Sequence, residues 1–192
     1  MHVLGKNRLL ILLFILIFST SGCVIQDQRS VGNIIDDRVI ATKVGHELIK
    51  NSLSNTSVNV CEGRVLLTGY ATDVSLKDKA EKVTWLVRGV KEVINNIVVT
   101  EKNKANIAKD LWIKTKLKTK FLANKKIQSV NYQVIVYNNV IYLLGIAENQ
   151  AELNEALKIA SKMKDVSEIK NYVIIKNDIR RNNNEMSCHN KR

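Results

Sequence analysis

The sequence has few of the residues on which catalysis, metal binding and disulfide scaffolds depend. Its 192 residues include three His, three Cys and no Pro. His2, His46 and His189 lie far apart in the chain, and none accompanies Cys or carboxylates at the spacing of a metal site. There is also no Ser-His-Asp layout and no Gly-rich phosphate loop. We therefore expect no enzyme activity, no metal, no cofactor and no small-molecule substrate.

Acidic residues and aromatics are also scarce. The net charge is +12, and aromatic residues make up 5% of the chain. A basic protein favours an acidic partner, either nucleic acid or an anionic membrane surface. The low aromatic content argues against nucleic acid, because few rings are available to stack on bases. A genome biased toward Lys, Asn and Ile would produce the same charge, so charge alone does not choose the partner.

The adjacent carboxylates Asp36 and Asp37 have two interpretations. They could form an acid–base pair, but charges at a helix N-terminus, favourable to the helix dipole, explain them better.

No apolar run is long enough to span a bilayer. The longest, Leu9–Phe18, has ten residues and would reach about 15 Å as a helix, against about 30 Å for a bilayer core. It follows Lys6 and Arg8 and precedes the small residues 19–22. This layout predicts an export signal over residues 1–22, cleaved before Cys23.

Gly22-Cys23 resembles the bacterial lipobox, in which the cysteine carries acyl chains such as palmitate after cleavage. Thr20 departs from the usual Leu, and the alternative is an ordinary secretory signal with an incidental Cys23. Val24 and Ile25 follow the cysteine directly, without the Asp that typically retains such lipoproteins in the inner membrane, so the resemblance implies an outer-membrane anchor facing the periplasm. The other cysteines, Cys61 and Cys188, could pair, but nothing in the sequence brings them together.

The chain contains two copies of one pattern, 76 residues apart. Val58-x-Val60-x-x-Gly63-x-Val65-x-Leu67-x-Gly69 matches Val134-x-Val136-x-x-Asn139-x-Ile141-x-Leu143-x-Gly145. In each copy a helix with an apolar stripe precedes two alternating strands, a second helix and a last strand. Glu62-Gly63 and Asn138-Asn139 predict tight hairpin turns. Asp73 and Asn149 are expected N-caps, and Glu152 stands at capping-box spacing from Asn149.

The predicted fold class is α+β, with two tandem αββαβ modules. Each is expected to hold a three-stranded mixed sheet with both helices on one face, because each strand offers one apolar face. We expect each module to fold by itself. The predicted segments are a signal peptide (1–22), a lipidated N-terminus and short tether (23–35), the first module (36–100), a linker (101–108), the second module (109–176) and a disordered basic tail (177–192).

The repeats resemble BON domains, and the arrangement resembles dual-BON-domain outer-membrane lipoproteins over roughly residues 23–176. The motifs that carry this resemblance are Cys23, Arg29-Ser30-Val31-Gly32, Asp36-Asp37, the hairpin Gly63–Gly69 and Trp112-Ile113-x-Thr115-Lys116. It implies a phospholipid-binding protein that supports envelope integrity and contacts anionic lipid through its second BON domain. The short spacer between Cys23 and Arg29 and the basic tail depart from the family pattern.

The first helices of the two copies differ in charge. Residues 36–50 hold three basic and three acidic residues, whereas 109–123 hold five lysines and one aspartate, for net charges of zero and +4. Trp112 lies about 100° around the helix from Ile113, away from the apolar stripe. An indole beside lysines suits a membrane interface. The predicted lipid-binding residues, for a phosphatidylglycerol-like membrane, are Trp112, Lys109, Lys114, Lys116 and Lys120.

Two other interpretations of this surface remain open. Trp112 could pack against the first module or the linker while the lysines are merely solvated. Alternatively, the protein is a structural envelope component that binds a protein partner through Trp112. A nucleic-acid-binding module is the least favoured function, because the export signal argues against it.

Overall fold

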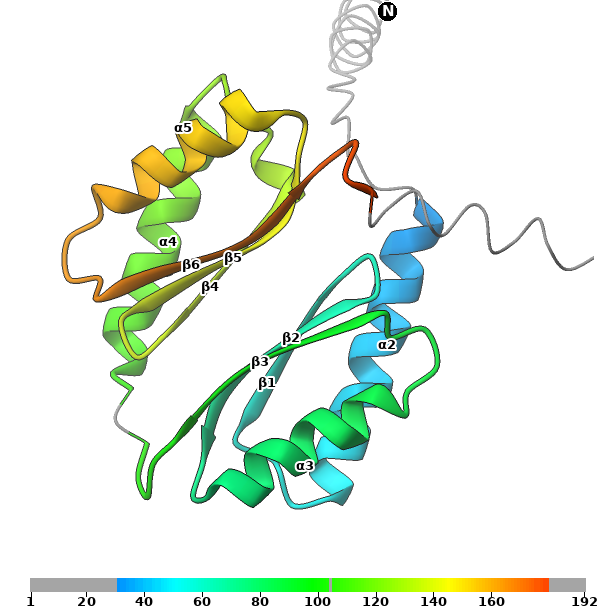
Figure 1. Cartoon of the computed structure of the whole chain (residues 1–192). Helices are drawn as coiled ribbons and strands as arrows, with labels where there is room; N and C mark the ends of the chain where they lie inside the picture. The colour runs from blue at the N-terminus through cyan, green and yellow to red at the C-terminus, as the bar shows by residue number, and fades with distance from the viewer. Residues whose placement is uncertain (1–30, 104, 180–192) are drawn as a thin grey trace, which may run out of the picture.

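The computed structural model describes residues 31–103 and 105–179 as two αββαβ modules joined by a short linker (Figure 1). Module 1 comprises α2 (Val31–Lys50), β1 (Thr56–Cys61), β2 (Arg64–Ala71), α3 (Val74–Trp85) and β3 (Glu92–Val99). Module 2 comprises α4 (Ile107–Ala123), the 3₁₀ turn η1 (Ser129–Asn131), β4 (Tyr132–Tyr137), β5 (Val140–Ala147), α5 (Gln150–Ser161) and β6 (Glu168–Ile175). The predicted signal peptide, Cys23, Cys188 and most of the predicted tail lie outside the described residues.

Each module has a mixed three-stranded sheet, as predicted. The first two strands pair antiparallel, and the third runs parallel to the second. The hairpin turns have positive φ at both central residues, 53° and 77° at Glu62 and Gly63, and 51° and 62° at Asn138 and Asn139. Gly and Asn suit this conformation, which matches the twist of the strands that it joins.

The helix boundaries agree with the sequence analysis at two predicted caps and differ from it at one helix start. Asp73 and Asn149 do cap α3 and α5, accepting hydrogen bonds from the amides of Leu76 and Glu152. Hydrogen bonds from the Ser75 hydroxyl and the Leu76 amide lower the pKa of Asp73. However, α2 begins at Val31, so the helix takes in residues 31–35, which the sequence analysis assigned to the tether.

The two sheets pack face to face, so that the molecule has four layers with the helices outside (Figure 1). Each module has a core between its helices and its sheet. A third cluster lies between the sheets and consists of Cys61, Leu66, Ile94, Ile135, Tyr142, Leu144, Ile146 and Ile174. Burial is the main reason that the pKa of Tyr142 is raised to about 12.

The expectation of one apolar face per strand was therefore wrong for the central strands. β2 and β5 carry apolar residues at consecutive positions, Val65-Leu66-Leu67 and Ile141 to Leu144, which a strand buried on both faces requires.

Polar contacts cross the same interface. Arg64 is only 5% exposed. Its Nε pairs with Glu92 at 2.6 Å, and its Nη1 donates to the Tyr172 carbonyl of module 2 at 2.8 Å. The Tyr172 hydroxyl accepts a hydrogen bond from the Asn96 side chain at 2.8 Å. Because a buried guanidinium needs such partners, these contacts fix how one sheet lies on the other.

Candidate membrane-binding surface

Helix α4 is held against its module by a buried stripe. Ile113, Leu117 and Phe121 are at most 1% exposed. At the start of the helix, the Asn106 side chain accepts a hydrogen bond from the Lys109 amide. Beyond this stripe and the buried Asp110, most of the helix surface faces outward, because one stripe occupies only part of the circumference.

Buried aspartates tie the first helix of each module to its hairpin. The Asp110 carboxylate accepts the amides of Asn138 and Asn139 at 2.8 and 2.9 Å. In module 1, Asp37 accepts the amides of Glu62 and Gly63, both at 2.8 Å. This corrects the interpretation of Asp37 as a charge at the helix N-terminus, since α2 starts six residues earlier and has no acidic residue in its first turn. The carboxylates are structural.

The predicted lipid-binding residues divide between two flanks of α4. Trp112 is 47% exposed, and the Lys116 Nζ lies 4.3 Å from its ring centroid. Lys120 is exposed one turn further along the same flank. Lys109 faces the α5–β6 connection, where its Nζ lies 3.7 Å from Asp165. Lys114 lies on the other flank, in a groove toward β4. The five residues therefore form no single cluster.

The flank of α4 that faces β4 carries exposed apolar residues that the sequence analysis missed. Ile107, Leu111 and Leu122 are 75%, 59% and 76% exposed. Within the described residues, α5 has no exposed large apolar side chain. The signal was available in the sequence: positions 107, 111, 114, 118 and 122 recur every three or four residues and form a second stripe.

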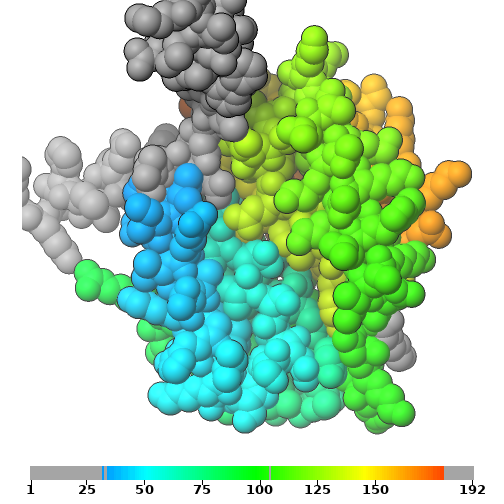
Figure 2. Space-filling model, turned by 180° about the vertical axis from the view of Figure 1, so that it is seen from behind, coloured from blue at the N-terminus to red at the C-terminus, as the bar shows by residue number. Residues whose placement is uncertain are grey.

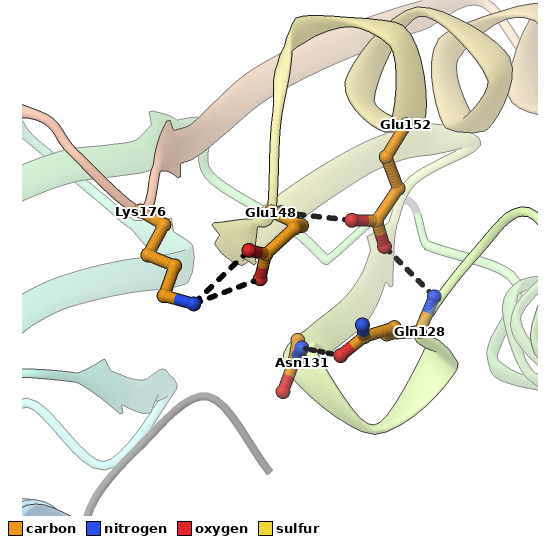
Figure 3. A network of polar contacts seen from close by, with 5 residues as sticks. All are labelled: Gln128, Asn131, Glu148, Glu152 and Lys176. Atoms are coloured by element: carbon orange, nitrogen blue, oxygen red, sulfur yellow. Dashed lines mark hydrogen bonds and ion pairs between the residues drawn. The ribbon is translucent and has the colours of Figure 1, made fainter. Parts of the chain in front are cut away.

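A polar network fixes the loop beside this flank (Figure 3). The Glu152 carboxylate accepts the amides of Glu148 and Gln128 at 2.8 and 2.7 Å, so it does not close a capping box with Asn149. The Gln128 side chain accepts a hydrogen bond from Asn131, and Lys176 pairs with Glu148 at 3.0 Å. Burial and the neighbouring Glu152 carboxylate raise the pKa of Tyr132. These contacts hold η1, which lies beside the C-terminal half of α4, in place.

The described residues offer neither a metal site nor a membrane span. They bring no three metal-ligating side chains together. None of their helices is both long and apolar enough to cross a bilayer. On α4, the described residues combine exposed apolar and basic side chains at the outer layer of an α/β/β/α body.

The BON domain family matches residues 36–101 and 109–177. The two αββαβ modules are thus BON domains, and the chain belongs to the family of tandem BON-domain envelope proteins, as its sequence motifs indicated.

Three relatives show how far the similarity extends. An uncharacterized protein in the gshII 5′ region of Anaplasma centrale is 39% identical over 145 residues, which cover 74% of this chain and 96% of that one. The outer membrane lipoprotein DolP of Haemophilus influenzae is 33% identical over 151 residues, covering 76% and 78%. A 21 kDa hemolysin of Actinobacillus pleuropneumoniae is 31% identical over 148 residues, covering 74% and 76%.

Proposed function

We propose that the protein is a non-catalytic outer-membrane lipoprotein, anchored through acyl chains on Cys23 and facing the periplasm, which supports envelope integrity. Its second BON domain binds anionic phospholipid through α4. The relative named as an outer membrane lipoprotein supports the location, as does the predicted export signal ending at Cys23.

The observation that carries the lipid-binding proposal is the surface of α4. It combines four exposed large apolar residues with five lysines, whereas its equivalent α2 has no net charge over residues 36–50. Apolar side chains that enter the headgroup region beside lysines are the pattern of an interfacial helix. Each lysine near an anionic surface contributes about 1 kcal/mol, so five lysines give a dissociation constant of roughly a few tenths of a millimolar.

Liposome flotation of the soluble form, residues 24–192, tests this proposal. We expect the protein to float with vesicles that contain phosphatidylglycerol, less so as salt rises, and not with neutral vesicles. Trp112→Glu should abolish flotation, because it removes the indole and adds a repelled charge. Lys116→Glu should weaken it.

Module 1 provides matched controls. Val39 on α2 occupies the position equivalent to Trp112 and is 44% exposed. Val39→Glu and Lys43→Glu add the same charges at equivalent sites and should leave flotation unchanged. If the α2 variants lose flotation as much as the α4 variants, the overall charge of the protein, and not α4, would account for binding. If the wild type does not float, the lipid-binding proposal is wrong, and binding of a protein partner becomes the favoured function of this surface.

The anchor has a separate test. Mass spectrometry of the mature protein should find an acylated Cys23 as the first residue and no residues 1–22. An unmodified N-terminus at any other residue would exclude the lipoprotein.

A further inference from the structure

The outer layer of module 1 has a groove between α2 and the connection from α3 to β3. Its apolar half is a hollow of about 620 Å³ between one side of α2 and residues 86–88. Its polar half is a hollow of about 440 Å³ that continues along α2 to Asp36 and reaches the β1–β2 turn. Because Lys43 and Arg88 line both halves, the two hollows form one groove, which we call the α2–α3 groove.

This groove lies away from the candidate membrane-binding surface. Helices α2 and α3 form one outer layer of the molecule, and α4 and α5 form the other (Figure 1). In Figure 2, α2 forms one border of the visible face and α4 the other. The two surfaces can therefore have different ligands.

The duplication shows that the fold does not require the apolar residues beside the groove. Trp85 ends α3 and is 48% exposed, and Leu86 follows it and is 84% exposed. At the same places in module 2, 76 residues later, α5 ends with Ser161, and Lys162 follows. Polar residues therefore satisfy the fold at this point. The exposed Trp85-Leu86 pair distinguishes module 1 from module 2.

The α2 side of the groove also differs in charge from its counterpart on α4. Asp37 of α2 matches Asp110 of α4, which sets the offset between the two helices at 73 positions. By this offset, Asp36 and Glu47 stand where α4 has lysines. A uniformly anionic surface such as a bilayer would be repelled by these carboxylates. The ligand of the groove should instead carry its negative charge at one place.

That place is the middle of the groove, where two cations are available. Among the described residues, neither Lys43 nor Arg88 has a carboxylate within ion-pair distance, and both side chains are exposed. The acidic residues stand toward the ends: Glu47 lines only the apolar half, and Asp36 and Glu62 line only the polar half. A carboxylate of a ligand would meet both cations where the two halves join.

The length of the groove suits a short peptide. Residues 36–47 of α2 extend about 17 Å, since an α-helix rises about 1.5 Å per residue. An extended chain of about five residues has the same length. The C-terminal tail of this chain is a poor occupant, because residues 180–192 hold four basic residues and one acidic residue. A segment of another protein with the opposite charge is complementary.

We propose that the α2–α3 groove binds a short acidic segment of a partner protein. A large apolar side chain of the segment lies over Leu86 and Val87, and a neighbouring carboxylate lies between Lys43 and Arg88. This site does not rest on the lipid binding proposed for α4. With the two surfaces on opposite outer layers, the protein can hold a partner through module 1 while module 2 contacts the bilayer.

Titration of the soluble form, residues 24–192, with an acidic pentapeptide tests the site. The probe is acetyl-Gly-Asp-Leu-Glu-Gly-amide, and NMR spectra of the backbone amides report its binding. We expect a dissociation constant of roughly a millimolar, with shifts concentrated in residues 42–47 and 86–91. A probe with Ser in place of Leu, or with Asn and Gln in place of the acidic residues, should bind roughly tenfold more weakly.

Substitutions in the protein locate the contacts. Leu86→Ser and Arg88→Glu should each weaken binding of the probe roughly tenfold. The matched control is Lys164→Glu, because Lys164 is the exposed equivalent of Arg88 in module 2, and it should leave binding unchanged. The double variant Lys43→Glu and Arg88→Glu should lose the acidic probe and bind acetyl-Gly-Lys-Leu-Lys-Gly-amide instead. Such an exchange of preference cannot result from unfolding.

Four results would overturn the proposal. The acidic probe could fail to bind, or could bind Arg88→Glu as well as the wild type. The same amides could shift with protein concentration alone, which would make a second copy of the chain the occupant. Lys43→Glu could weaken flotation with anionic vesicles as much as Lys116→Glu does, which would make the groove part of the membrane-binding surface. Failure of the wild type to float would overturn only the lipid binding proposed for α4.

Discussion

Gly69 and Gly145 occupy equivalent places in β2 and β5, where the central strand passes the backbone that leads into the edge strand. Their φ angles are 124° and 154°. A Cβ on Gly145 would lie 2.1 Å from the carbonyl oxygen of Asn131, and one on Gly69 would lie equally close to that of Asn55. Such an approach is open only to glycine.

Gly145→Ala should therefore lower the free energy of unfolding by about 3 kcal/mol, because backbone atoms of Asn131 and Tyr132, where η1 leads into β4, would have to move. Gly45→Ala is the matched control. Nothing lies within 4 Å of a Cβ at that position in α2, so alanine should stabilise the helix by about 1 kcal/mol. Urea denaturation of the two variants measures both values. Equal stability of Gly145→Ala and the wild type would contradict the close approach.

The sequence repeat identified both glycines as matched positions but gave no reason for them. The reason is a carbonyl oxygen on a neighbouring segment, and a one-dimensional pattern holds no information on such a distance. The turn residues Gly63 and Asn139 were easier to predict, since positive φ is a local property that the residue type itself indicates.

At the scale of elements, the first helix of each module depends on one carboxylate. Asp110 is 6% exposed and serves two amides of the β4–β5 turn. Asp110→Ala should lower the free energy of unfolding by roughly 2–3 kcal/mol, since two hairpin amides would lose a charged acceptor. Asp37→Ala should have a similar effect in module 1. Thermal melts followed by circular dichroism would show it. If both variants are as stable as the wild type, water must accept the hairpin amide hydrogen bonds as well as the carboxylates do.

The candidate site was only partly predictable from the sequence. Helical periodicity placed Trp112 off the buried stripe, and counting charges distinguished α4 from α2. Which flank of α4 faces α5 and which faces β4 depends on how the helices pack on the sheet. The exposed Leu111 and Leu122 were for that reason missed, although their spacing is visible in the sequence.

At the scale of the whole molecule, the interface between the sheets changes what a single module can do. The sequence analysis expected two self-contained modules, but Tyr142, Leu144 and Ile146 are at most 2% exposed against module 1. Residues 104–178 alone would expose this face. We expect the fragment to lose at least about 4 kcal/mol of stability or to self-associate through its sheet. Sedimentation would detect self-association, and thermal melts would measure the stability of the fragment. A monomeric fragment as stable as the full chain would show that the interface between the sheets contributes no stability.

The early start of α2 has a consequence for binding strength. Only seven residues, 24–30, separate Cys23 from Val31. With an anchor at Cys23, an extended chain of this length would keep the helix within about 25–30 Å of the bilayer. So short a tether would give membrane lipid an effective concentration in the millimolar range at the protein's binding surface, as in a bivalent ligand. A headgroup site with a dissociation constant near a millimolar would then be substantially occupied, and modest changes in local lipid composition would be enough to fill or empty it.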